Sequence, residues 1–246
     1  MDAGFHRGGP RRRKGDIRTP PSQRFYIWAA LTCVAIAVAG FGRSYYLRPI
    51  FENTPLPTLL HVHGAIMSSW CLLFGVQSYL VATHRVRLHQ RLGILGAVLA
   101  ILVVVVGADV TVEATAREVR DHVVHRFHFL LGLNLVNLLV FATLVVTALA
   151  LRIRPDFHKR LMLLATVTML APATARIVLL ATHGAMVQLL AFDFCILACV
   201  VVDTVLHRRL HPAFGWGAAF ILGSFHLIFI ALGERWWLPF VAWVFS

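Results

Sequence analysis

Long apolar runs, separated by short polar connections, recur along the whole chain. Seven of these runs approach the roughly 20 residues that a helix needs to cross about 30 Å of hydrocarbon. They occupy residues 25–47, 58–82, 92–114, 125–151, 160–182, 185–206 and 213–233. The pattern predicts an all-α membrane protein, a seven-transmembrane helix bundle.

The two ends of the chain differ from this pattern. Residues 1–24 are rich in Gly, Pro and Arg, which predicts a disordered basic cytoplasmic tail ahead of a transmembrane domain over residues 25–246. The last apolar segment, Trp236 to Phe245, is too short to cross a bilayer. We expect it to lie at the interface or to extend the seventh helix.

Basic residues are concentrated in alternate connections between the apolar runs. Sixteen Lys and Arg residues lie in the tail and in the turns near 83–91, 152–160 and 207–212, against six in the other connections. Cytoplasmic loops of membrane proteins carry such an excess of Lys and Arg. The count therefore predicts a cytoplasmic N-terminus and a C-terminus outside.

Composition agrees with lipid as the solvent and suggests the partners. The chain is 59% hydrophobic and 14% charged, with a net charge of +12. Because the basic residues form short patches between apolar runs rather than one soluble face, we reject nucleic acid as a partner. The expected partners are the lipid bilayer and, at the basic turns, anionic lipid headgroups.

Histidine recurs at the outer start and at the inner turn of three successive pairs of spans. The intervals are 26 residues from His63 to His89, 30 from His128 to His158 and 28 from His183 to His211. At about 1.5 Å per residue, each interval is one membrane crossing. The chain therefore reads as one leading helix plus three helical hairpins, with a layer of histidine at each face.

These layers supply candidate cofactor ligands. Imidazoles from two facing helices are a usual way to hold a haem iron or a transition metal inside a helix bundle. The candidates for haem b or a transition metal are His63 with His128 at the outer face and His89 with His158 at the inner face. Weaker metal-ligand candidates are His61 and His183. The competing interpretation is that histidine is simply tolerated at helix ends.

Three of the charged residues inside the apolar runs form a second group of candidates. Asp109, Arg176 and Asp193 all lie in the outer third of their spans by residue counting. A lone charge at this depth is costly and usually pairs within the bundle. We expect an ion pair of Arg176 with Asp193 or Asp109. Such a pair would line a proton or substrate path or act only as a packing clamp.

Short motifs along the chain carry a family resemblance. They are His61-Val62-His63-Gly64, His89-Gln90-Arg91-Leu92-Gly93, His158-Lys159-Arg160-Leu161-Met162-Leu163-Leu164-Ala165, Ala175-Arg176 and His211-Pro212. With these motifs the chain resembles a group of uncharacterised, small, multi-span bacterial inner-membrane proteins. The resemblance implies a multi-pass protein of the bacterial inner (cell) membrane and supplies no activity. His125 and His128 depart from the pattern, which counts against a haem site built on His63 and His128.

Familiar enzyme motifs do not decide the function. The sequence has no HExxH, P-loop, GxSxG or GxGxxG motif followed by an acid, so peptidase, ATPase and dehydrogenase readings lack support. Catalytic residues and enzymatic activity are left open. Three hypotheses remain: haem or metal binding for electron transfer or redox-centre assembly, a proton-coupled small-solute transporter or channel using the Arg/Asp group, and a non-catalytic assembly role with a protein partner.

Overall fold

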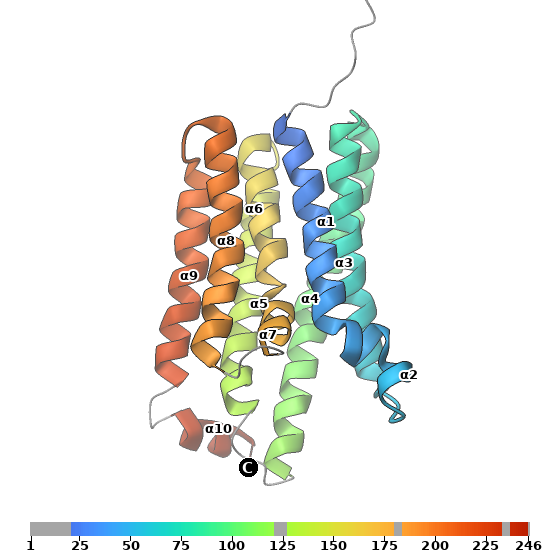
Figure 1. Ribbon diagram of the computed structural model, residues 1–246, viewed down its shortest axis with the longest axis vertical. Coiled ribbons are helices and arrows are strands. Elements are labelled where there is room, and N and C mark those ends of the chain that lie inside the picture. The colour runs from blue at the N-terminus through green and yellow to red at the C-terminus, as the bar shows by residue number, and fades with distance from the viewer. Residues whose placement is uncertain (1–20, 121–126, 180–183, 233–236, 246) are drawn as a thin grey trace, which may run out of the picture.

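The computed structural model describes residues 21–120, 127–179, 184–232 and 237–245, and all regular structure within them is helical. The elements are α1 (Pro21–Phe41), η1 (Gly42–Tyr46, a π-helical turn), α2 (Arg48–Phe51), α3 (Thr58–Ala82), α4 (Val86–Arg120), α5 (Phe127–Ala150), α6 (Pro155–Thr168), α7 (Ala171–Leu179), α8 (Ala185–His207), α9 (Pro212–Leu232) and α10 (Trp237–Phe245). The long helices run side by side in one bundle (Figure 1). The predicted all-α architecture is confirmed.

The spans match the predicted count. Among the described residues, six helical segments are long and apolar enough to cross a membrane, and the bent pair α6–α7 brings the number to seven if it is counted as one span. Large apolar side chains on these helices point outward: Ile94, Phe194 and Leu227 are each at least 70% exposed. A soluble protein rarely exposes so much contiguous apolar surface. The chain is therefore an integral membrane protein.

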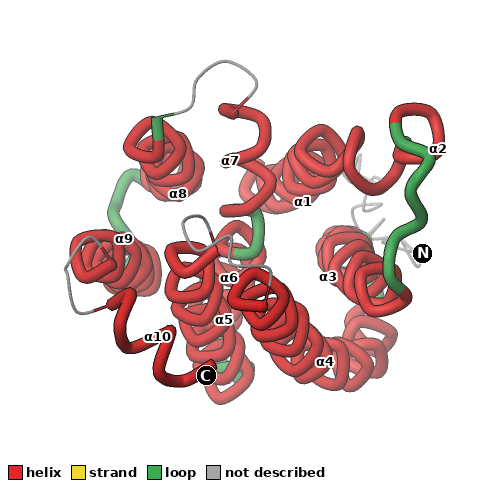
Figure 2. The backbone as a smooth tube through the Cα atoms, turned by 90° about the horizontal axis from the view of Figure 1, so that it is seen from below, coloured by secondary structure: helices red, strands yellow, loops and turns green. Residues whose placement is uncertain are grey.

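Three helical hairpins follow the leading helix, as the sequence predicted. α3 packs against α4, α5 against α6, and α8 against α9, while α1 contacts α3, α7 and α8. Figure 2 shows α1 lying between α3 and α7. The three hairpin turns, residues 83–85, 151–154 and 208–211, lie at the end where α1 begins (Figure 1). We call this the basic end and the opposite one the far end.

The fifth span is broken, although the sequence predicted a continuous run over 160–182. α6 ends at Thr168, and α7 leaves it at an angle of 42°. The cause is Pro172, which has no N–H to donate to the carbonyl of Thr168 and whose ring clashes with that carbonyl. The described part of the span is thus two helices, and α7 lies towards the far end (Figure 1).

Several helix ends differ from the sequence prediction. α1 starts at Pro21, four residues before the predicted span, and residues 1–20 of the expected tail lie outside the described residues. α4 starts at Val86, six residues before the predicted span, because its basic first turn is also helical. α10 is a separate short helix that lies across the far end (Figures 1 and 2), in agreement with the interfacial alternative.

The core is centred on α6, which contacts α3, α5 and α9. Trp70 packs edge-on against Phe141 with ring centroids 4.9 Å apart. Phe141, Phe214 and Leu164 have no exposed surface. Because lipid competes equally well for apolar side chains, tight packing and internal polar contacts must hold such a bundle together. The polar contacts inside the bundle are therefore the candidate functional sites.

Candidate functional site

A buried charge pair joins α6 to α8 near the basic end. Arg160 Nε donates to Asp203 Oδ2 at 2.8 Å, and the two side chains are 2% and 0% exposed. Tyr26 of α1 donates its hydroxyl to the other oxygen, Oδ1, at 3.3 Å. Arg160 also donates through NH1 to the carbonyl of Asp156 at 2.9 Å. One carboxylate thus ties together three helices.

Sequence reasoning did not find this cluster. In the sequence Arg160 belongs to the basic residues of a turn, whereas the structure turns its guanidinium into the bundle. Asp203 was the available signal, because it is an acid inside the apolar run 185–206 and only a turn of helix from the basic end. An acid in that position needs a nearby cation.

Two further histidines flank the charge pair. His207 Nδ1 lies 2.8 Å from the Asp203 carbonyl and 3.3 Å from its Oδ1. His211 is buried, its Nδ1 accepts the backbone N–H of Ala213 at 3.1 Å, and its ring packs edge-on against Phe157. Burial and the charge of Arg160 lower the pKa of His211. Beside it lies a surface hollow of about 420 Å³, whose lining is Arg154, Pro155, Asp156, Phe157 and His211.

The two inner histidines of the sequence hypothesis lie next to each other. His89 is the fourth residue of α4 and His158 the fourth of α6, and their ring centroids are 6.3 Å apart with planes at 81°. His158 Nδ1 lies 2.8 Å from the carbonyl of Ala148. Because a carbonyl only accepts, Nδ1 carries the proton and Nε2 keeps a free lone pair. His89 Nδ1 is buried and has no hydrogen-bond partner among the described residues.

The outer histidines are only partly described. His63 of α3 is half-buried, and its Nδ1 is buried without a partner among the described residues. The side chain of His128 and all of His183 lie outside the described residues, so pairing of His63 with His128 stays a prediction. His61 is exposed, and its carbonyl accepts the Tyr45 hydroxyl at 3.2 Å.

The three charged residues that the sequence suggested as an ion pair, Arg176, Asp193 and Asp109, do not contact one another. Arg176 stacks its guanidinium 4.4 Å from the ring centre of Phe41 and donates to the Pro172 carbonyl at 3.1 Å. Asp193 instead faces His226, with Oδ2 3.4 Å from Nε2. Asp109 is exposed on α4. The ion pairs among the described residues include neither Arg176 nor Asp109.

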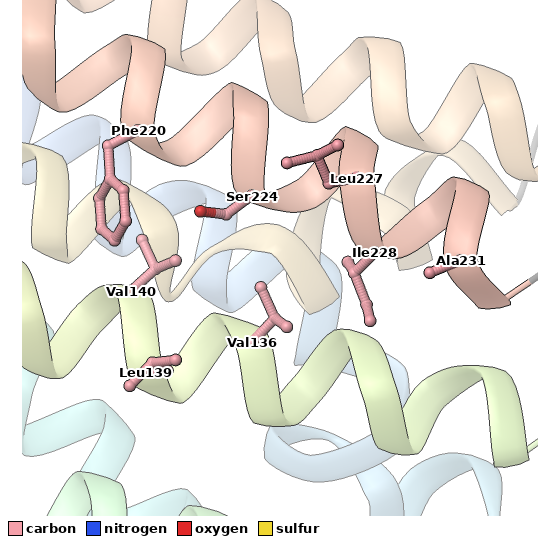
Figure 3. Close-up of a pocket in the computed structure, with 8 residues that line it drawn as sticks. All are labelled: Val136, Leu139, Val140, Phe220, Ser224, Leu227, Ile228 and Ala231. Carbon is pink, nitrogen blue, oxygen red and sulfur yellow. The ribbon is translucent and has the colours of Figure 1, made fainter. Parts of the chain in front are cut away.

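A groove of about 330 Å³ opens between α5 and α9 (Figure 3). Its lining is apolar apart from Ser224, and includes Val136, Leu139, Val140, Phe220, Leu227, Ile228 and Ala231. Such a surface suits a lipid acyl chain and offers no group for acid–base or metal chemistry. The polar clusters therefore remain the candidates for function.

Comparison with known proteins adds no assignment. Neither a protein-family model, nor a characterised protein, nor a solved structure matches the chain. Within the described residues there is also no group of three or more His, Cys, Asp or Glu side chains placed to hold a metal ion. Function is therefore argued from the geometry of the polar clusters.

Proposed function

We propose that this membrane protein binds haem b at its basic end through His89 and His158, and serves in electron transfer or redox-centre assembly. The observation that carries the proposal is the 6.3 Å separation of the two rings, which come from different hairpins at matched depth. Imidazoles on opposite sides of one metal ion, each about 2.0 Å from it, have ring centres roughly 6 Å apart. The separation is therefore one at which His89 and His158 would together hold the iron of a haem.

The surroundings of His158 support a ligand role. A ligating histidine usually donates its other ring N–H to a carbonyl or carboxylate, which fixes the tautomer and the ring orientation. The Ala148 carbonyl does this for His158. Two residues further on, Arg160 anchors the same helix to Asp203, so the imidazole is held on a rigid element. His89 has no competing partner at Nδ1 within the described residues.

The donor set favours haem over a bare metal ion. A transition-metal ion usually takes three or four protein ligands, whereas haem supplies four nitrogens and needs at most two. The pair of His89 and His158 supplies two. The basic residues near the two histidines, Arg85, Arg87, Arg91 and Lys159, would offset the negative charge of the propionates of a bound haem.

A bound haem would supply one-electron chemistry. The residues of the chain would then orient the iron through His89 and His158 and keep the ring positions fixed through Ala148 and the Arg160–Asp203 pair. The apolar bundle around them would exclude water, which sets the reduction potential of a haem. The position near one end of the bundle suits exchange of electrons at that membrane face.

An optical spectrum tests the proposal. Protein purified from haem-replete cells should show haem absorption, with one haem per chain, and the reduced-minus-oxidised difference should be lost in both His89→Ala and His158→Ala. His61→Ala, an exposed histidine at the far end, is the matched control and should keep the haem. Circular dichroism checks that each variant folds. A colourless wild-type protein, or haem retained in both inner variants, would overturn the proposal.

A transporter or channel is the second candidate, and Arg176 is the observation that favours it. This cation lies in the broken span α6–α7 and forms no ion pair with an acid among the described residues. Broken helices near substrate sites are typical of secondary transporters. The test is uptake of small anions into proteoliposomes, with and without a proton gradient. Arg176→Gln should abolish it, and equal uptake by this variant would count against the role.

The orientation and partners of the bundle are further proposals. The charge count supports a basic end that faces the cytoplasm of a bacterial inner membrane and binds anionic lipid headgroups there. Alkylation of single cysteines introduced at Arg85 and Asn53 in intact cells tests this, because only the second should react. A non-catalytic assembly role would instead appear as a haem-free protein that co-purifies stoichiometrically with a protein partner.

A further inference from the structure

Asp193 and His226 form a polar pair between α8 and α9 within the membrane-spanning region. Asp193 is buried, with 8% of its surface exposed, and Oδ2 lies 3.4 Å from His226 Nε2. The other carboxyl oxygen, Oδ1, is buried and has no hydrogen-bond partner among the described residues. The His226 side chain is 43% exposed.

The contacts of His226 determine how many protons the pair holds. His226 Nδ1 lies 2.8 Å from the carbonyl of Leu222, so Nδ1 carries a hydrogen. Nε2 then faces a carboxyl oxygen, and the contact is attractive only if a proton lies between them. The pair is either imidazolium with carboxylate or imidazole with carboxylic acid. Both forms contain the same single bridging proton.

Asp203 and Asp193 differ in their partners, and the difference favours a proton-binding site at Asp193 over a purely structural contact. Asp203 has a permanent cation, Arg160, and a hydroxyl donor, Tyr26, so it needs no titratable proton. Among the described residues of the elements packed against α8, namely α1, α6, α7 and α9, the group paired with Asp193 is His226, whereas Arg176 of α7 stacks on Phe41 instead. Loss of the bridging proton would leave a carboxylate in an apolar region without a cation, which is costly.

We propose that Asp193 and His226 together form a proton-binding site that takes up and releases one proton. Uptake changes the charge of the pair from −1 to 0, and no other group is oxidised, reduced or transferred. The site lies in the half of the bundle nearer the far end, so it is separate from the inner histidines. It does not depend on the proposed haem.

Infrared spectroscopy of the protein in vesicles tests the site. At neutral pH the wild type should show either the C=O stretch of a buried carboxylic acid or the ring bands of an imidazolium. The signal should shift in D2O and vanish at high pH. Asp193→Asn and His226→Gln should each remove or alter it, and Asp109→Asn, an exposed carboxylate on α4, is the matched control.

The outcomes separate this proposal from the haem proposal. The signal should be unchanged in His158→Ala, which removes only an inner histidine. A neutral-pH spectrum with ionised carboxylate and neutral imidazole would overturn the proton assignment. A proton signal that neither exchanges with D2O nor responds to pH would overturn the uptake and show a fixed structural bond.

Discussion

Arg160 and Asp203 form a charge pair that is closed to solvent. The Nε–Oδ2 distance is 2.8 Å, and the side chains are 2% and 0% exposed. Burial of two ions is costly unless the geometry is good and the remaining lone pairs are satisfied. Here the Tyr26 hydroxyl and the Asp156 carbonyl provide those additional bonds. The pair therefore fixes how α6 and α8 sit against each other rather than adding much net stability.

Removal of one partner should destabilise the bundle strongly. Asp203→Ala leaves the Arg160 guanidinium buried without a counter-charge, so we expect a loss of about 3–5 kcal/mol in the free energy of unfolding. The measurement is reversible denaturation in mixed micelles. Asp156→Ala is the control, because its carboxylate is 68% exposed and its ion pairs should contribute less than about 1 kcal/mol. Equal effects of the two variants would contradict the assignment.

Substitution by alanine should have opposite effects on stability at two glycines, one of which lies where α1 and α7 approach each other closely. A Cβ on Gly40 would lie 2.5 Å from the carbonyl oxygen and 2.7 Å from the Cα of Ala173, and backbone cannot move aside cheaply. We expect Gly40→Ala to cost about 1–3 kcal/mol in unfolding free energy. Gly223 on α9 has nothing within 4 Å of such a Cβ, so Gly223→Ala should stabilise by about 0.5–1 kcal/mol. Thermal denaturation of both variants measures these changes. A stabilising Gly40→Ala would show that α1 and α7 are farther apart than the structure places them.

The helical architecture was predictable from the sequence because a bilayer permits few backbone structures. Backbone groups in a bilayer must bond within a helix, so apolar runs of sufficient length translate directly into spans. The matched depth of His89 and His158 followed from their positions in the first turns of two helices. The bend in the fifth span did not follow, because neighbours in a bundle sometimes compensate for a proline and here, at Pro172, they do not.

The lateral pairing of charges was not predictable. Residue counting gives depth in the membrane, and by depth Arg176 and Asp193 are suitable partners. Pairing also requires the rotation of each helix and the order of helices around the bundle, which depend on packing. In the structure Asp193 faces α9 and meets His226, whereas Arg176 faces Phe41 on α1. For the same reason the sequence does not predict that Asp203 pairs with Arg160, 43 residues away.

His211 should make the stability of the bundle depend on pH. Its pKa is lowered in the folded state, chiefly by burial, so the unfolded chain binds a proton at a pH where the folded chain does not. Stability should therefore be full above the unfolded value of about 6.5 and fall as the pH is lowered below it. Unfolding free energies measured across this range check the slope. His211→Asn retains an acceptor for the Ala213 N–H and should flatten it. An unchanged slope in the variant would assign the pH dependence to other groups.

A double-mutant cycle tests whether Tyr26 acts through Asp203. Tyr26→Phe removes one hydroxyl that donates to a charged, buried acceptor, so we expect a loss of about 1.5–3 kcal/mol in unfolding free energy. In an Asp203→Ala background the hydroxyl has lost that acceptor, and the same change should have much less effect. The difference between the two backgrounds measures the coupling. Equal losses in both would mean that Tyr26 contributes only by packing, and that α1 is not tied to the Arg160–Asp203 pair.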